Sequence, residues 1–226
     1  MTTLHPSLEG ARACVFDAGG TLIHPDWGRL ARLAAGVTGR EFGAEELRLA
    51  LSEYLKAPTG QKGRHWTFRG MYCSLGVDEE ACGRVIELLD EEHVRRHIWC
   101  GPDPEAARVI EELKGAGLAV AVISNTEDGR ALDALEAAGL ARHFDLVVDS
   151  HLVGCRKPDP TIFRLALERL GVEPHEAAFV GDSYEADALA ARAAGLRPVL
   201  LDPLGLHTAC DCPRIRSLAE LVGGAV

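Results

Sequence analysis

Five short apolar runs recur along the chain and predict the strands of a sheet. They cover Ala13–Phe16, Leu118–Ser124, Phe144–Ser150, Ala177–Asp182 and Arg197–Asp202. Because their Val, Ile, Leu and Ala content is nearly continuous, we expect strands that are buried on both faces. Amphipathic stretches with helical spacing lie between these runs, at Pro104–Ala116, Gly129–Ala138, Thr161–Leu170 and Tyr184–Ala194. The alternation predicts an α/β fold built from parallel βαβ units with right-handed crossovers.

The segment from residue 23 to residue 98 interrupts this alternation. Its hydrophobic spacing predicts four helices, at Trp27–Ala35, Glu45–Lys56, Trp66–Leu75 and Glu79–Arg95. A helical stretch of about 75 residues is too long for one crossover connection and indicates an insertion. We therefore expect two domains, a core of residues 1–22 and 99–226 and a helical insertion of residues 23–98.

The composition narrows the classes of protein to consider. The 226 residues are 47% hydrophobic and 26% charged, which is typical of a soluble globular protein. A formal net charge of −10 and the absence of a long basic run argue against binding to nucleic acid or to an anionic membrane. No apolar run is long enough to span a bilayer. The sequence carries no indication of an oligomeric state.

Cysteine usage favours a reducing compartment. The seven cysteines are an odd and scattered set, which fits reduced thiols and a cytoplasmic location better than a disulfide framework. Cys210 and Cys212 are the only pair close in sequence, and no second pair follows them. Since one pair supplies only half of a zinc site, we interpret it as structural.

The first apolar run ends in an aspartate on a glycine-rich turn, Asp17-Ala18-Gly19-Gly20-Thr21-Leu22. A carboxylate at a strand end, with backbone N–H groups turned toward it, suits nucleophilic attack on phosphorus. Taken alone, Asp17 fits a helix cap or a surface turn equally well. The same holds for Ser124-Asn125-Thr126 after the second run, where a hydroxyl and turn amides can hold a phosphate oxygen.

Two further segments carry candidate chemistry. Lys157 precedes Pro158-Asp159-Pro160, and the two prolines bracket a rigid helix entry that would aim the lysine reproducibly. Asp182 and Asp187, five residues apart after the fourth run, can serve one hard cation together. An exposed lysine and an N-capping acidic cluster are the alternatives for these residues.

The four segments together, in this order, resemble the motifs of the haloacid dehalogenase-like hydrolases, over residues 12–203. Asp17, Gly20, Thr21 and Leu22 match the first motif, Ser124 the second, Lys157 the third and the Gly-Asp-x-x-x-x-Asp spacing of residues 181–187 the fourth. The resemblance implies a Rossmann-like doubly wound parallel sheet of strand order 3-2-1-4-5, a helical cap after the first strand, Mg²⁺ and a phosphoaspartate intermediate.

The expected protein is thus a magnesium-dependent hydrolase of a small phosphorylated metabolite. The resemblance implies three sets of site residues: catalytic Asp17, Ser124 and Lys157, substrate-binding Gly20, Thr21 and Asn125, and metal-binding Asp17, Gly19, Asp182 and Asp187.

Gly19 departs from the pattern of the family's phosphatases. They carry a second aspartate at this position, which protonates the leaving oxygen and helps activate the attacking water. Glycine retains only a backbone carbonyl as a metal ligand, and general acid–base catalysis is worth ~10²–10⁴-fold in rate. We therefore expect slow hydrolysis unless another group, such as His24 or Glu127, supplies the proton.

Three other readings follow from the same departure. Phosphonatases of the family carry an alanine at this position and use a cap lysine, for which Lys56 and Lys62 are the candidates. The second alternative is a catalytically impaired protein that only binds a phospholigand. Dehalogenases of the family carry a tyrosine and lack the metal aspartate, so the presence of Asp182 disfavours them.

Overall fold

The chain forms two units that are continuous through a pair of short strands. The structure, a computed structural model, describes residues 3–56 and 64–223. One unit consists of Met1–His24 and Pro102–Val226, and the other of Pro25–Gly101. The chain passes between them within β2 (Ile23–Pro25) and β3 (Trp99–Pro102), which pair as a two-stranded sheet. The sequence predicts neither of these strands, because three or four residues carry too little periodicity.

The larger unit is built on a parallel sheet. Among the described residues its six strands are ordered β5-β4-β1-β6-β7-β8. Their bounds are β1 Ala13–Phe16, β4 Ala119–Ser124, β5 Leu146–Asp149, β6 Ala177–Gly181, β7 Arg197–Leu201 and β8 Arg214–Ile215. The predicted order 3-2-1-4-5 is confirmed for the first five, and β8 adds a short edge strand that was not predicted. Phe16 of β1 pairs with Val122 of β4 and with Val180 of β6, so these three strands end at one edge.

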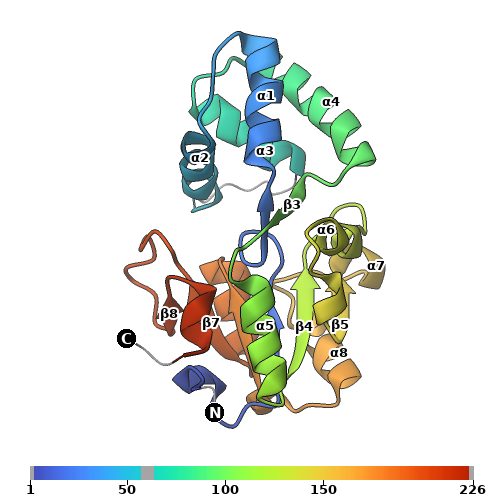
Figure 1. The fold of residues 1–226 in the computed structure, drawn as a ribbon, viewed down its shortest axis with the longest axis vertical. Helices are drawn as coiled ribbons and strands as arrows, with labels where there is room; N and C mark the ends of the chain where they lie inside the picture. Colours follow the sequence, from blue (N-terminus) through green and yellow to red (C-terminus); the bar gives the residue numbers. More distant parts are fainter. Residues whose placement is uncertain (1–2, 57–63, 224–226) are drawn as a thin grey trace. The chain divides into compact units, whose positions relative to one another are not determined.

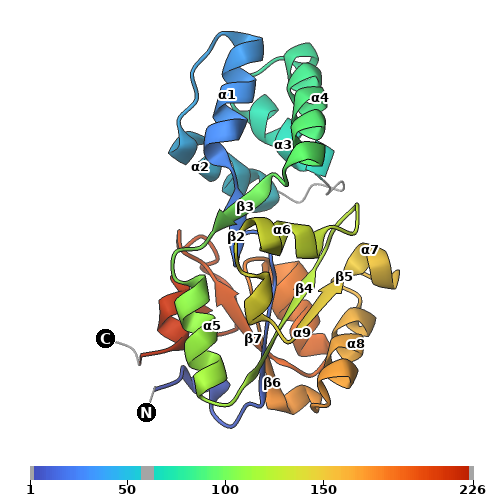
Figure 2. The same cartoon turned by 45° about the vertical axis from the view of Figure 1, so that its right-hand side comes forward.

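Helices cover both faces of this sheet, which is why its strands are continuous apolar runs. On one face Ala13 and Val15 pack with Phe163 of α8 (Pro160–Leu170) and Ala191 of α9 (Ala190–Ala193). Figures 1 and 2 show α5 (Ala106–Gly115) on the opposite face. Full burial of a phenylalanine side chain such as that of Phe163 contributes about 1.5–3 kcal/mol.

The last predicted helix of this unit differs from the expectation. Instead of one α-helix over Tyr184–Ala194, the structure has a π-helical turn, η4 (Tyr184–Leu189), followed by the short helix α9. The carbonyl of Ser183 accepts from the amides of both Asp187 and Ala188, and the second bond spans the wider turn. π-turns occur often at functional sites. The remaining short helices of the unit are η1 Pro6–Leu8, α6 Ala131–Ala137, η2 Ala141–His143, α7 Ser150–Val153, η3 Pro174–Glu176 and η5 Leu218–Leu221.

The smaller unit is helical and has its own core. Its helices, among the described residues, are α1 Trp27–Thr38, α2 Ala44–Lys56, α3 Arg64–Ser74 and α4 Glu79–Arg95. Each overlaps a predicted helix, and α4 has the predicted bounds. Asp78 begins α4 by accepting a hydrogen bond from the amide of Ala81 at 2.9 Å. In the core, the hydroxyl of fully buried Tyr72 donates to the carbonyl of Leu30 at 2.9 Å.

Candidate functional site

Asp17 lies where β1 ends, and its backbone is fixed by the sheet. Its amide donates to the carbonyl of Val180 at 2.8 Å, and the residue is 7% exposed. A tight turn follows, in which the carbonyl of Ala18 accepts from Ile23 and the amide of Gly20 donates to the carbonyl of Ile23. Neither bond uses the carbonyl of Gly19. Gly20 has φ +90°, a conformation that side chains disfavour.

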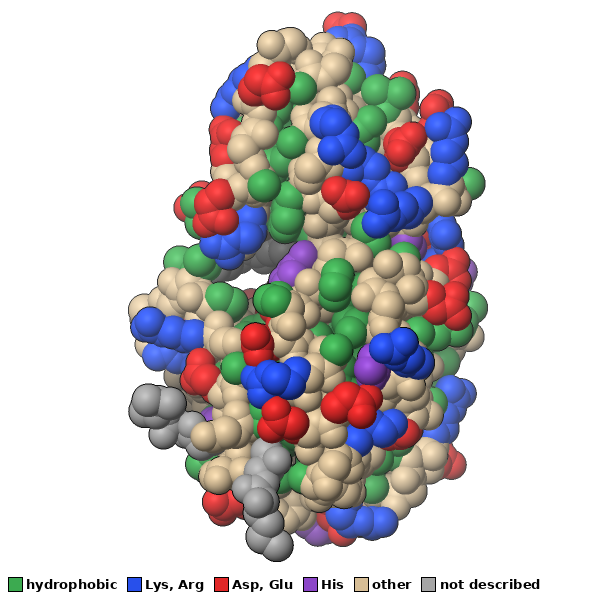
Figure 3. Space-filling model, in the orientation of Figure 1, with side chains coloured by type: hydrophobic (Ala, Val, Ile, Leu, Met, Phe, Trp, Pro, Cys, Tyr) green, Lys and Arg blue, Asp and Glu red, His purple; other side chains and the backbone are tan. Residues whose placement is uncertain are grey.

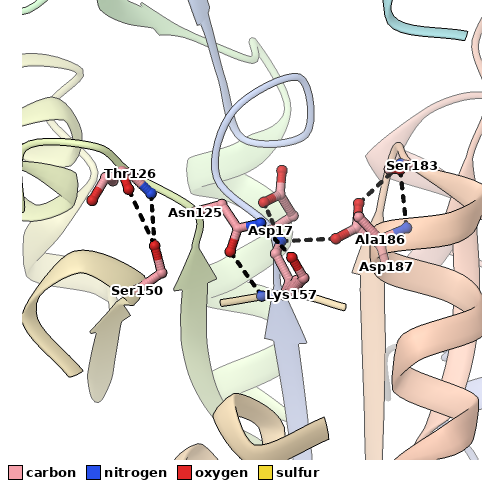
Figure 4. Close-up of polar contacts among 8 residues, drawn as sticks. All are labelled: Asp17, Asn125, Thr126, Ser150, Lys157, Ser183, Ala186 and Asp187. Carbon is pink, nitrogen blue, oxygen red and sulfur yellow. Dashed lines mark hydrogen bonds and ion pairs between the residues drawn. The ribbon is translucent and has the colours of Figure 1, made fainter. Parts of the chain in front are cut away.

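Lys157 reaches Asp17 from the loop that precedes α8. Its Nζ lies 2.5 Å from Oδ1 of Asp17 and 2.8 Å from Oδ1 of Asp187, and all three side chains are buried (Figure 4). Buried charges persist only when they are paired, and this lysine has two partners. The helix entry expected from the sequence is present, with Asp159 capping the amide of Thr161 at 2.8 Å.

Asn125 holds the backbone of Lys157. Its Oδ1 accepts from the amide of Lys157 at 2.9 Å, and its Nδ2 donates to the carbonyl of Lys157 at 2.9 Å (Figure 4). The side-chain amide therefore positions the lysine, which the sequence did not predict. The substrate contact expected of Asn125 stays a prediction.

Three carboxylates meet at the ends of β1 and β6. Asp17, Asp182 and Asp187 each offer an oxygen, and these oxygens lie within 4.8 Å of one another. The other oxygen of Asp187 accepts from the amide of Ser183 at 2.9 Å, as Figure 4 shows. Gly20 packs directly against this cluster, since a Cβ on Gly20 would lie 2.2 Å from Oδ2 of Asp182. A glycine is therefore required at this position.

Two carboxylates of the cluster, Asp17 and Asp182, have raised pKa values, because they are buried close to one another. The pKa of Asp17 is raised to about 6. Burial is the main cause; Lys157 lowers the pKa, and Asp187 raises it. Burial and the two neighbouring carboxylates raise the pKa of Asp182 well above its usual range. Burial disfavours the charge on Lys157, but Asp17 and Asp187 outweigh it and raise the pKa of the ammonium. One ammonium among three carboxylates leaves a local excess of negative charge when all are ionised.

The other predicted residues lie along the same edge of the sheet. Ser124 is buried and ends β4, two residues beyond the partner of Phe16. Thr21 is fully buried, and its hydroxyl is one of the buried polar atoms without a hydrogen-bond partner among the described residues. Beyond Ser124, the hydroxyl of Ser150 accepts from the amide of Thr126 at 3.0 Å (Figure 4). A carboxylate oxygen of Asp149 accepts a hydrogen bond from the hydroxyl of Thr126. The sequence did not indicate a role for Asp149.

Both candidate replacements for the missing acid have interactions in the structure. His24 Nε2 lies 3.8 Å from Oδ2 of Asp103, so its ion-pair partner is outside the carboxylate cluster. Glu127 likewise takes part in a polar or electrostatic interaction. Of the two lysines considered for a phosphonatase, Lys62 and the side chain of Lys56 lie outside the described residues.

Charged side chains of both signs share the face of the molecule that Figure 3 shows. On the face shown in Figure 3, the described acidic and basic side chains are interspersed over each unit. Such a mixture lacks the basic track with which proteins follow nucleic acid. In the described parts of the chain, every helix is too short or too polar to cross a bilayer.

Comparison with known proteins places the chain among hydrolases. A sequence model of the haloacid dehalogenase-like hydrolases matches residues 11–195. A phosphoserine phosphatase from Thermus thermophilus is 46% identical over 139 residues, which cover 62% of this chain and 54% of that protein. An (S)-2-haloacid dehalogenase 4A from Burkholderia cepacia is 30% identical over 189 residues, 78% of this chain and 77% of the relative.

Solved structures agree on the fold. The crystal structure of a dehalogenase with an intermediate complex has a TM-score of 0.65 and 27% identity, and the match covers 94% of this chain and 96% of the other. The chain spans about half the length of several curated relatives that it matches.

Proposed function

The chain belongs to the haloacid dehalogenase-like hydrolase family, and we propose that it is a magnesium-dependent hydrolase of a small phosphorylated metabolite. The observation that carries the proposal is the Lys157 ammonium, held between Asp17 and Asp187 beside a third carboxylate. The phosphatase among the relatives supports phosphorus as the atom attacked. We further propose that the protein is cytoplasmic, since its cysteines are free.

The donor set fits magnesium. Mg²⁺ prefers carboxylate and carbonyl oxygens, and three carboxylates offer oxygens within 4.8 Å of one another. We assign the metal to Asp17, Asp182 and the carbonyl of Gly19. Asp187 supports the shell, because its two oxygens are already engaged by Lys157 and by the amide of Ser183. When bound, magnesium would offset charge on the phosphoryl oxygens and on the carboxylates.

The residues of this chain have distinct tasks in the proposed reaction. Asp17 attacks phosphorus and forms an acyl phosphate as the bond to the leaving oxygen breaks. Lys157, fixed by Asn125, balances charge on Asp17 and on the phosphoryl group. Ser124 and the buried hydroxyl of Thr21 are the neutral donors that we assign to phosphoryl oxygens. Water then attacks the acyl phosphate, releases phosphate and restores the carboxylate.

Gly19 makes the departure of the leaving group the difficult step. No side chain is present there to protonate the leaving oxygen, so its own stability controls the rate. We therefore propose that acyl and aryl phosphates react much faster than alkyl phosphates.

Residues 25–101 lie at the position in the chain where this family inserts its cap. We assign to this helical unit the role of a cap that selects the substrate. The residues outside it supply the proposed chemistry.

A panel of phosphorylated metabolites with magnesium tests the proposal. Phosphate release that Asp17→Asn abolishes would support it. Binding of phosphate with magnesium but without turnover on any member would instead indicate a protein that binds phospholigands. Borohydride-dependent inactivation with a phosphonate substrate would indicate a lysine imine and hence a phosphonatase.

Carbon–halogen hydrolysis is the second candidate, because the dehalogenase from Burkholderia cepacia matches three quarters of the chain. The carboxylate cluster disfavours it, since three carboxylates without a metal repel an anionic haloacid. Halide release from 2-haloacids in the presence of a chelator would decide for the dehalogenase. Phosphate release that a chelator abolishes would decide for the phosphatase.

A further inference from the structure

Two cysteines meet where α3 gives way to α4. Cys73 is the last residue but one of α3, and Cys82 is the fourth residue of α4. Their Sγ atoms lie 3.1 Å apart, although the structure contains both as free thiols. A disulfide bond measures about 2.05 Å, so the sulfurs need to approach by roughly 1 Å to bond.

The turn between the two helices holds the sulfurs in this arrangement. The amide of Gly76 donates to the carbonyl of Cys73 at 3.0 Å, and the amide of Val77 donates to the carbonyl of Tyr72 at 3.1 Å. The thiol of Cys82 lies 3.5 Å from the carbonyl of Val77, which is within bonding reach of sulfur. The pair is therefore preorganised by backbone contacts on both sides.

We propose that Cys73 and Cys82 form a redox-active dithiol, which closes to a disulfide by exchange with a small-molecule disulfide such as oxidised glutathione. The disulfide would link the end of α3 covalently to the start of α4. This inference concerns only the helical unit and is independent of the reaction proposed for Asp17.

Exposure decides which sulfur reacts first. Cys73 is partly exposed, whereas Cys82 is fully buried in the core of the helical unit. Burial, together with the hydrogen bond to Cys73, raises the pKa of the Cys82 thiol to about 12, so Cys82 stays protonated and does not start the exchange. Cys73 is therefore the sulfur that an incoming disulfide can reach.

A fixed positive charge lies beside the pair. Arg69 of α3 is ion-paired with Glu79, the first residue of α4. A Cβ on Gly83, the neighbour of Cys82, would lie 3.9 Å from Nη1 of Arg69. This ion pair joins α3 to α4 beside the two cysteines.

The exchange balances in two steps. The Cys73 thiolate attacks one sulfur of oxidised glutathione, forms a mixed disulfide and releases one glutathione thiolate. The released glutathione thiolate then takes the proton of Cys82, and the Cys82 sulfur attacks Cys73 Sγ, which breaks the mixed disulfide and releases the second glutathione. Two protein thiols are oxidised to one disulfide, and one molecule of oxidised glutathione is reduced to two thiols.

Cys210 and Cys212 provide an internal comparison. They are two residues apart, and the Cys210 sulfur lies 3.8 Å from the carbonyl oxygen of Cys212. Oxidation that reflected only general thiol reactivity would involve this partly exposed pair as readily as Cys73 and Cys82.

The test uses the full chain, reduced and then equilibrated in glutathione buffers of increasing oxidised fraction. After quenching by alkylation, digestion without reductant and mass spectrometry should find a cross-linked peptide joining residues 73 and 82. Dithiothreitol should remove it, and thermal unfolding of the helical unit, followed by tryptophan fluorescence, should shift upward on oxidation. Alkylation of both cysteines at every oxidised fraction would overturn the proposal.

Single variants test the order of the two steps. Cys82→Ser should accumulate glutathione on Cys73, because the resolving thiol is missing, whereas Cys73→Ser should acquire none on Cys82. Cys210→Ser should form the cross-link as the parent does. Glutathione on Cys82 in Cys73→Ser, or loss of the cross-link in Cys210→Ser, would refute the assigned roles. The cross-link in the parent protein needs no variant, so a folding defect in Cys82→Ser leaves the test decisive.

Discussion

Replacing Asp17 with asparagine should abolish turnover and at the same time stabilise the protein. The pKa of Asp17 rises from 3.8 to about 6 in the folded protein, mainly because the carboxylate is buried. Since each pKa unit corresponds to 1.36 kcal/mol, the ionised carboxylate is about 3 kcal/mol less stable in the folded protein than in the unfolded chain. The asparagine amide carries no charge and avoids this penalty. Asp17→Asn should therefore unfold at higher urea concentration than the parent near neutral pH.

The pH dependence gives the sign of the effect. Below pH 3.8 the carboxyl is protonated in both states, and it contributes no difference in stability. Between pH 4 and 6 the unfolded chain ionises first, so the parent loses stability as pH rises through this window. Above about pH 6 the loss is complete. The stability difference between variant and parent should accordingly grow from near zero at pH 4 to about 3 kcal/mol at pH 7.5.

Urea unfolding in a chelating buffer between pH 4 and 8 measures this difference. All three tryptophans belong to the helical unit, so the unit that contains Asp17 should be followed by circular dichroism. Asp133→Asn, at a carboxylate that is 53% exposed on α6, is the matched control and should lack the gain in stability expected of Asp17→Asn near neutral pH. Added magnesium should narrow the gap by stabilising the parent. A variant less stable than the parent at pH 7.5, or a difference that does not change with pH, would refute the reasoning.

The remaining predictions concern the residues around Asp17. Asp182→Ala should steeply raise the magnesium concentration needed for activity, because a hard cation loses an anionic ligand; an unchanged titration would place the metal elsewhere. Asn125→Ala loses two hydrogen bonds and should cost about 1–3 kcal/mol of stability; because Lys157 is no longer fixed, kcat should fall while KM changes less. Asn125→Asp, which keeps one acceptor, should have a kcat between those of the parent and Asn125→Ala. Equal kcat in all three proteins would contradict a positioning role. Gly19→Asp should raise alkyl phosphate turnover more than aryl phosphate turnover, by up to ~10²–10⁴-fold; if neither changes, another group donates the proton, and His24→Ala and Glu127→Ala are then the variants to compare.

Much of the fold follows from local patterns in the sequence. The strands β1, β4 and β6 are buried on both faces, so their apolar content is unbroken and easily recognised. Parallel strands end at one edge of the sheet, so residues that directly follow three such strands must lie close together. The grouping of Asp17 with Asp182 and the position of Ser124 could be inferred in this way.

Features that depend on distant or unusual contacts could not be inferred. Nothing in the sequence indicates that the amide of Asn125 bonds the backbone of Lys157, because this contact joins residues 32 apart in two different loops. The wide turn at Tyr184–Leu189 keeps the composition of an ordinary helix, and the sequence alone predicts an α-helix. The approach of Cys73 to Cys82 depends on how α3 and α4 pack, which helical periodicity does not specify.

The insertion between β2 and β3 has a consequence for synthesis on the ribosome. Residues 25–101 form one uninterrupted segment with its own core, which can fold as soon as it emerges. β1 is made first, yet it lies between β4 and β6 and pairs with Val122 and Val180, which are made long afterwards. Even after β4 is available, one edge of this apolar strand stays unpaired until β6 appears, which exposes it to aggregation. A ribosome stalled just before residue 177 should therefore hold a folded helical unit, a protease-sensitive β1 and a carboxylate at position 17 that still lacks its neighbours from β6.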